Sequence, residues 1–360
     1  MCPNFAIPQD LPPMPSHLRE VLRFVISSYE KIVNTSFFQS DHVQTIRVRE
    51  SMSWRLQISP AARWSMFLAA KVFEGMTENS QTPTVRFAKY YDWIDRLEKH
   101  LDSVPWDGFT EIQVSHRLAE KLELNLFKLR TTNSINTYQL LQRHAPSFLR
   151  IVSSDPAFWS DTCPPTKVSL AHVLASERYE VTHFALLDMI MGSWIIGPLP
   201  DWYRVERELL DWKPSTRSVP GEEGWKAIAR LAVRESWRHA LLIYLYMGVC
   251  GVKSDDPRVR SSVKQVFQII DTVKEKPQPI THLHFSTQYL IAGAYTPNEK
   301  QRATAREELS ISIKTGTWLL NGSDFVPVLD HLWHGAAAGG RAIQWSDYAH
   351  SRQVALPIPI

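Results

Sequence analysis

One stretch of the sequence, residues 235–259 (ESWRHALLIYLYMGVCGVKSDDPRV), constrains the fold most strongly. It begins with apolar residues at helical spacing on one side and charged residues on the other, and from Leu241 to Cys250 it is apolar all round. That run is too short for a membrane span, which needs about 20 apolar residues. We therefore expect a helix that its neighbours cover on every side.

The residues after this helix predict a sharp stop and a second helix. Gly251 follows the apolar run, as glycine often follows a helix C-terminus. Asp256 then stands at the N-cap position, with Pro257 at the first helical position. The stretch should form a helical hairpin at the centre of the core, with Trp237 buried beside Arg238. Replacing that tryptophan with alanine would then cost roughly 3–5 kcal/mol.

The rest of the chain predicts an all-α fold. Apolar residues recur at helical spacing in most segments, and no run of several strands shows the alternation that a sheet requires. We expect an irregular array of roughly a dozen packed helices with no significant sheet. One of them starts after Thr296-Pro297-Asn298-Glu299, which reads as a capping box, and its polar sequence (EKQRATAREELS) predicts a solvent-facing helix.

The domain organisation is less constrained than the fold class. Residues 1–15 are rich in proline and predict an extended arm, without the pattern of a signal peptide. Residues 16–360 predict a single all-helical domain, as one lobe or as two lobes with a linker near 211–224. No segment reaches transmembrane length, so no membrane association is expected.

Cysteine usage and charge exclude several functional classes. Cys2, Cys163 and Cys250 lie far apart, which predicts neither a disulfide framework nor a cysteine zinc site and fits the cytosol or nucleus. The net charge of +3 does not by itself indicate nucleic-acid binding. One segment combines arginines with tryptophans, namely Arg47, Arg49, Arg55, Arg63, Trp54 and Trp64. These residues could form a basic, aromatic surface for nucleic acid, but a solvated helix face is the favoured interpretation.

No catalytic, cofactor or metal site is predicted. His282 and His284 lie two residues apart and His331 and His334 three apart, but neither pair has an evident third ligand, so structural roles are favoured. The chain has no nucleophile elbow and no phosphate-binding glycine motif. Residues 335–340 (GAAAGG) follow a predicted helix rather than a strand, which favours a close-packed turn over an anion cradle.

Several motifs resemble those of the fungal-specific transcription factor domain, which lies C-terminal to zinc binuclear cluster DNA-binding modules. They are ESWRHALLIYLYMGVCG at 235–251, SDDPRVRSSVKQVFQI at 254–269, LIAGA at 290–294, DFVPVLDHLWHGAAAGGRAIQWSDYAHSR at 324–352 and LPI at 356–358. Looser similarity includes DLPPMPSHLREVLRFVISSYE at 10–30. The motif residues resemble a structural fingerprint rather than a binding site: Trp237, Arg238, Tyr244, Tyr246, Gly248, Asp256, Pro257, Arg258, Trp333, His334, Gly335, Trp345, Asp347 and Tyr348.

The resemblance implies a non-catalytic regulatory domain of a nuclear, or alternatively cytoplasmic, transcription factor. Its expected partners are transcription-related proteins or homologous regulators, with DNA reached only indirectly and no cofactor. The zinc cluster of the family needs six clustered cysteines, whereas only Cys2 lies near the start of this sequence. Two alternatives remain open, namely a free-standing helical scaffold that pairs with intact regulators and a small-molecule sensor. The sensor would have its pocket between residues 184–196 and 237–250.

Overall fold

The computed structural model describes ten stretches of the chain: residues 14–35, 42–78, 83–103, 108–131, 134–159, 168–191, 202–213, 224–273, 284–315 and 322–356. These stretches hold fifteen α-helices and no strand, and their only β interaction is an isolated bridge between Trp159 and Val168. The predicted all-α fold is therefore confirmed. Within the same stretches, no helix combines the length and apolarity needed to cross a bilayer.

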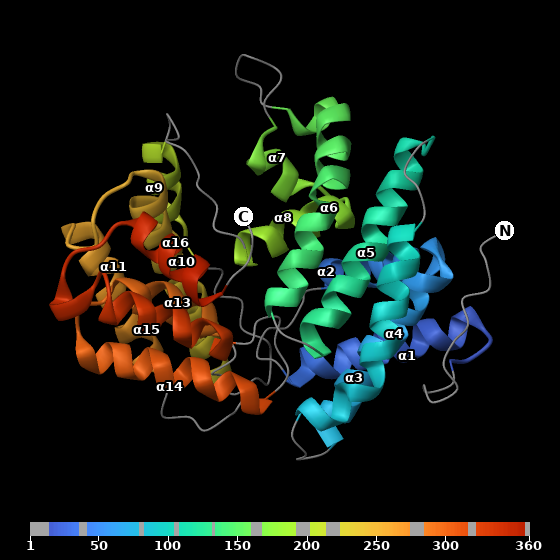
Figure 1. Ribbon diagram of the computed structural model, residues 1–360, viewed down its shortest axis with the longest axis horizontal. Coiled ribbons are helices and arrows are strands. Elements are labelled where there is room, and N and C mark those ends of the chain that lie inside the picture. Colours follow the sequence, from blue (N-terminus) through green and yellow to red (C-terminus); the bar gives the residue numbers. More distant parts are fainter. Residues whose placement is uncertain are drawn as a thin grey trace. The chain divides into compact units, whose positions relative to one another are not determined.

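The chain divides into two compact units (Figure 1). The first comprises residues 1–33 and 40–192, and the second comprises residues 34–39 and 193–360. The expected linker, residues 211–224, falls within the second unit, and its residues 214–223 lie outside the described part of the chain. The expected N-terminal arm is also outside it up to residue 13.

The first unit is a bundle in which α4, α5 and α6 lie side by side (Figure 1). Helix α5 packs against α3, α4, α6 and α8. Edge-to-face contacts of Phe127 with Tyr90 and Trp93, both at 5.7 Å between ring centroids, join α4 to α5 in the core. The helices of this unit are α1 (Leu18–Thr35), α2 (His42–Ile58), α3 (Pro60–Glu78), α4 (Pro83–Ser103), α5 (Glu111–Thr131), α6 (Ser134–Ser154), the 3-10 turn η1 (Pro156–Phe158), α7 (Leu170–Ala175) and α8 (Tyr179–Met191).

The second unit is built around α10 and α13. Helix α10 packs against α11 and α13, and α13 also contacts α14 and α15 (Figure 1). Tyr289, Phe285 and Phe325 are fully buried in this core. Its helices are α9 (Trp202–Asp211), α10 (Gly224–Tyr244), the π-helical turn η2 (Leu245–Val249), α11 (Pro257–Asp271), α13 (Ser286–Tyr295), α14 (Glu299–Thr315), η3 (Gly322–Phe325), α15 (Val326–His334), η4 (Ala338–Gly340) and α16 (Trp345–Ala355).

The predicted hairpin is present, with two corrections. Gly251 adopts φ +65°, so it ends the first arm in the left-handed conformation that glycine tolerates, and Asp256 caps α11 as expected. The first arm, however, begins at Gly224 and not near residue 235, and it finishes as the π-helical turn. The expectation of cover on every side was wrong at Leu241, which is 39% exposed. The expected burial of Trp237 was also wrong, because this side chain is only half-buried.

The polar helix α14 was expected to face solvent throughout, and this was wrong. Its Arg302, Ala305, Glu308 and Leu309 are buried, because one side of the helix packs on α13 and η3. The start of the helix also differs from the predicted capping box. Asn298 is the cap, since its Oδ1 accepts hydrogen bonds from the backbone N–H groups of residues 300 and 301.

Candidate functional site

The fingerprint residues all lie in the second unit, and most of them gather in three clusters. The latch cluster lies at the π-helical turn and the start of α11, and contains Tyr246, Asp256 and Arg258. The aromatic cluster contains Tyr244, Trp345 and Tyr348. The third cluster surrounds Trp333 on α15.

The latch cluster joins three segments through polar contacts. The Tyr246 hydroxyl on η2 donates a 2.7 Å hydrogen bond to Glu206 Oε1 on α9. The Arg258 guanidinium lies 4.6 Å from the centroid of the Tyr246 ring, and its Nη1 is 3.9 Å from Glu206 Oε1. Asp256 Oδ1 accepts hydrogen bonds from the backbone N and Nε of Arg258, and Oδ2 accepts one from Nη2. The N-cap residue thereby also orients the arginine towards α9.

The electrostatics of the latch cluster favour stable ion pairing over acid–base chemistry. Hydrogen bonds from the Arg258 side chain hold the pKa of the Asp256 carboxyl below its ordinary value. Burial, with the hydrogen bond to Glu206, raises the pKa of the Tyr246 hydroxyl. Burial also raises the pKa of the nearby Cys250 thiol, so this cysteine is a poor nucleophile at neutral pH.

The aromatic cluster fixes α16 against the end of α10. The Trp345 ring meets Tyr244 edge-to-face at 4.9 Å and lies 5.5 Å from the ring of Tyr348. A Cβ atom at Gly248 would already touch the Trp345 ring at 3.6 Å, so the glycine allows a close approach of the indole. Burial raises the pKa of the Tyr244 hydroxyl to about 12. Asp347 caps α16 by accepting a 2.7 Å hydrogen bond from the backbone N of residue 344.

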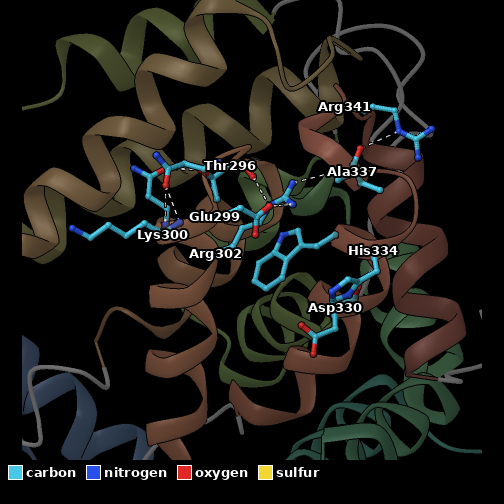
Figure 2. Close-up of polar contacts among 12 residues, drawn as sticks. Thr296, Glu299, Lys300, Arg302, Asp330, His334, Ala337 and Arg341 are labelled. Carbon is cyan, nitrogen blue, oxygen red and sulfur yellow. Dashed lines mark hydrogen bonds and ion pairs between the residues drawn. The ribbon is translucent and has the colours of Figure 1, made fainter.

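Arg302 is the centre of the third cluster (Figure 2). Its Nε donates to the carbonyl oxygen of Thr296 and its Nη2 to that of Ala337, both at 3.0 Å. Its Nη1 pairs with the exposed Glu299 at 2.8 Å. The guanidinium carbon lies 5.7 Å from the Trp333 ring, whose Nε1 donates a 3.0 Å hydrogen bond to the Gly293 carbonyl. This buried arginine therefore ties α13, α14 and the turn after α15 together.

The histidine and glycine motifs have structural surroundings. His331 Nδ1 lies 3.0 Å from Ser351 Oγ, and His334 Nδ1 lies 2.7 Å from the Asp330 carbonyl oxygen. His282 falls outside the described residues, and burial lowers the pKa of His284 to about 4. Residues 335–340 form a turn in which Arg341 donates hydrogen bonds to the carbonyls of residues 335 and 338. In the described stretches, no three His, Cys, Asp or Glu side chains are placed to share a metal ion.

The arginines considered for nucleic-acid binding lie in the first unit and have protein partners. Arg55 Nη1 forms a buried ion pair with Glu123 Oε1 at 2.5 Å, and Arg63 Nε donates to the Leu56 carbonyl oxygen. Arg47 and Arg49 form exposed ion pairs with acidic residues, and Trp64 is buried. The solvated-face interpretation is therefore wrong for Arg55 and Trp64. It fits the exposed Arg47, Arg49 and Trp54, whereas Arg63 is half-buried.

Sequence reasoning missed three residues that hold the clusters together. Glu206 and Arg302 were not singled out, because each acts through a partner distant in sequence and lies in no quoted family motif. Gly293 lies in the LIAGA motif but was not among the fingerprint residues, because only the folded structure shows how closely Ala305 and Trp333 approach it. Two fingerprint residues lie outside the three clusters. Arg238 pairs with Glu235 and donates through Nη1 to the Leu210 carbonyl oxygen at 3.3 Å, while Trp237 is half-buried on α10.

The geometry of these clusters suits the joining of helices rather than the binding of a ligand. The hollow beside Arg302, lined also by Ser254 and Ile343, measures about 10 Å³, which is room for a single water molecule. Arg302 has carbonyl partners, and Arg55 and Glu123 have each other. The clusters therefore fix how the helices of the second unit meet.

Comparison with known proteins supports the resemblance for the second unit. Residues 199–356 match the family described as "Fungal specific transcription factor domain". The match covers less than half of the chain but nearly all of the second unit. No curated protein and no solved structure gives a significant match. The match supports a regulatory role in transcription, in a kind of domain that is not catalytic.

Proposed function

We propose that this chain is the regulatory, non-catalytic part of a zinc-cluster-type transcription factor. The premise is that residues 199–356 belong to the fungal specific transcription factor domain family. It works in the nucleus through contacts with transcription-related proteins or homologous regulators. It reaches DNA only through a DNA-binding module that it does not itself carry within these 360 residues.

One observation carries the proposal, which is the coincidence of the family match with one compact unit. The matched segment, residues 199–356, lies within the unit formed mainly by residues 193–360. The polar clusters in that unit fix helix packing, as a module that transmits contacts between proteins requires. His331, His334 and the glycine turn, which were candidates for chemistry, have hydrogen-bond partners from their own fold.

A tethering experiment tests the regulatory role. The chain is inserted between a heterologous DNA-binding domain and a strong activation domain, and transcription of a reporter is measured in a fungal host. We expect reporter output to differ from that of a fusion carrying an unrelated helical domain of similar size. Equal output from the two fusions at equal protein level would contradict the proposal.

The indirect route to DNA has its own test. A gel-shift assay with the purified chain and a pool of random duplexes should select no sequence. Tight, sequence-specific binding by the chain alone would show that it reads DNA unaided. The genomic sequence upstream of Met1 gives an independent check, because a reading frame there with clustered cysteines would supply the zinc cluster.

A sensor is the second candidate, and a groove in the first unit favours it. The groove measures about 600 Å³, a volume typical of small-molecule sites, and lies between the start of α1 and the end of α2. Leu18, Leu22 and Leu56 line it together with Arg19 and Arg23. The pocket first expected between residues 184–196 and 237–250 stays a prediction. Its two sides belong to different units, and residues 192–196 lie outside the described part of the chain.

A thermal-shift screen with fungal metabolites tests the sensor. A ligand present at 100 times its Kd stabilises the folded state by about 2.7 kcal/mol, enough for a clear rise in Tm. An Arg23→Glu variant should lose the shift if the ligand is anionic and lies in the groove. The scaffold alternative predicts instead that the tagged chain co-precipitates full-length homologous regulators expressed in the same host.

A further inference from the structure

Helix α9 is attached to the second unit in an unusual way, because none of its residues is fully buried. Trp202, Val205, Glu206 and Leu209 are half-buried on one side, and the other side faces solvent. The neighbouring α10 and α11, by contrast, bury eight and six residues. A helix as short as α9 is unstable alone in water, so its contacts with the rest of the unit must keep it folded.

Polar contacts add to the half-buried apolar side chains that hold α9. Glu206 accepts the hydrogen bond from the Tyr246 hydroxyl and lies within ion-pair distance of Arg258. The Arg258 guanidinium also lies 5.8 Å from the Trp202 ring. At the other end of the helix, Arg238 donates a hydrogen bond to the Leu210 carbonyl oxygen. Breaking these contacts exposes no fully buried side chain of α9 itself, so releasing this helix uncovers fewer buried side chains of its own than releasing α10 or α11 would.

The surface beneath α9 is firmly held. The π-helical turn is closed by a 2.9 Å hydrogen bond from Cys250 N to the Leu245 carbonyl oxygen, and its Tyr246, Met247 and Val249 side chains are buried. Such turns are rare and often occur at functional positions. A weakly attached helix therefore rests on a rigid and irregular surface.

We propose that α9 is a latched cover that opens as a unit and exposes the π-helical turn, with the contact between Glu206 and Tyr246 as the latch. Opening is a property of the fold. Its use as a switch, in which a partner of the regulator gains access to the turn, rests on the proposed function. Two separate readouts distinguish the two statements.

Hydrogen exchange measures the opening. In the full chain, amides of α9 should exchange faster than those of α10. The α9 amides should exchange still faster in Tyr246→Phe, which removes the hydroxyl and keeps the ring beneath Arg258. Because a hydrogen bond to a charged group is lost, we expect an increase of about tenfold. Glu208→Gln is the matched control, since Glu208 forms an exposed ion pair with Arg204 on the same helix.

Three results of this experiment decide whether α9 opens as a unit. Faster exchange confined to α9 in Tyr246→Phe, with α13 unchanged, supports the cover. Exchange that rises equally in α9 and α13 shows general destabilisation and overturns the proposed cover. The cover is also overturned if α9 and α10 exchange at the same rate in the parent protein and Tyr246→Phe leaves the α9 rate unchanged. Trypsin provides a second measurement, because Arg204 and Arg207 are exposed on α9 but need local unfolding for cleavage. Cleavage there should accelerate in Tyr246→Phe and not in Glu208→Gln.

The reporter fusion decides whether the opening of α9 serves regulation. If opening serves regulation, Tyr246→Phe changes reporter output relative to Glu208→Gln at equal protein level. An unchanged reporter together with faster α9 exchange overturns the regulatory use and leaves the opening established. A reporter that never responds to the parent chain contradicts the proposed function itself, independently of the exchange result.

Discussion

Arg302 donates a 3.0 Å hydrogen bond through Nη2 to the carbonyl oxygen of Ala337, which lies 35 residues further along the chain. The arginine is buried, and the acceptor belongs to the turn that follows α15. The same carbonyl also accepts a 3.2 Å hydrogen bond from the backbone N of Gly340, so the guanidinium is its second donor. The contact fixes the glycine-rich turn against α14 (Figure 2).

Replacing Arg302 should destabilise the second unit strongly. In Arg302→Met, the Thr296 carbonyl loses its donor and the Ala337 carbonyl keeps only its bond from Gly340 N. An unsatisfied buried group costs about 1–3 kcal/mol, and the second lost hydrogen bond adds about 1 kcal/mol. We expect a total loss of about 2–5 kcal/mol in urea unfolding. Arg306→Met is the control, because Arg306 is half exposed in its ion pair with Asp330 and should cost about 1 kcal/mol or less.

A methyl group at Gly293 should disrupt the crossing of α13 and α14. An added Cβ would lie 2.8 Å from Ala305 Cβ, a distance that packed carbon atoms do not tolerate, and alanine has no flexible end that could move aside. We expect Gly293→Ala to lower the free energy of unfolding by about 1–3 kcal/mol despite the higher helix propensity of alanine. Gly224→Ala meets nothing within 4 Å and should be neutral or slightly stabilising. Circular dichroism melts of both variants provide the comparison.

The two tryptophans of the fingerprint should differ in their contribution to stability. Trp333 is 5% exposed and its Nε1 is hydrogen-bonded, so Trp333→Ala should cost about 3–5 kcal/mol. Trp237 is half-buried, so its replacement should cost less, about 1–2 kcal/mol instead of the 3–5 kcal/mol expected for full burial. Equal losses in chemical denaturation would contradict the difference in burial.

Features encoded by neighbouring residues could be predicted, whereas contacts between distant residues could not. The stop at Gly251 and the cap at Asp256 follow from local backbone chemistry, and both are present. The hydrogen bond between Tyr246 and Glu206 joins residues 40 apart, and nothing in the sequence around Glu206 indicates it. The burial of Arg302 was missed for the same reason, because a polar sequence predicts solvent exposure unless a distant carbonyl is known to need a donor.

The π-helical turn marks a further limit. The run from Leu241 to Cys250 is apolar all round, and that pattern is the same for an α-helix and for a wider turn. The exposure of Leu241 was equally hidden, because an apolar residue is compatible with either side of a helix. Conversely, the helical periodicity of the first unit sufficed to predict that its segments are helices. Helix α6 runs from Ser134 to Ser154 and continues through Pro146, which lacks a backbone N–H donor.

His144 should make the first unit sensitive to acid. Its ring is 1% exposed, and burial together with the positive charges of Lys121, Arg143, Arg117 and Lys128 holds its pKa well below the ordinary 6.5. Because the folded-state pKa lies below the unfolded one, the unfolded state binds the extra proton at low pH. The stability is therefore fully present above about pH 6.5 and decreases as the pH falls below it.

A glutamine at His144 isolates this effect. The slope of unfolding free energy against pH between 6 and 5 should decrease in His144→Gln, by up to about 1.4 kcal/mol per pH unit for one proton. His239 and His284, whose pKa values burial lowers to about 4, contribute in the same direction and remain in both proteins. Urea unfolding at several pH values measures the slope, and identical slopes would show that His144 is not kept neutral.

Breaking the ion pair between Arg55 and Glu123 should lower the stability of the first unit strongly, whereas replacing both residues with apolar ones should lower it little. Their side chains are 11% and 6% exposed, and the guanidinium lies 4.2 Å from the centroid of the Tyr179 ring. Arg55→Met or Glu123→Leu alone leaves one buried charge without its partner, which typically costs about 3–5 kcal/mol. The double variant removes both charges and should recover most of that loss. Arg49→Met, which breaks an exposed pair with Glu30, should cost about 1 kcal/mol or less, so equal losses at the two arginines would show that burial does not set the strength of these pairs.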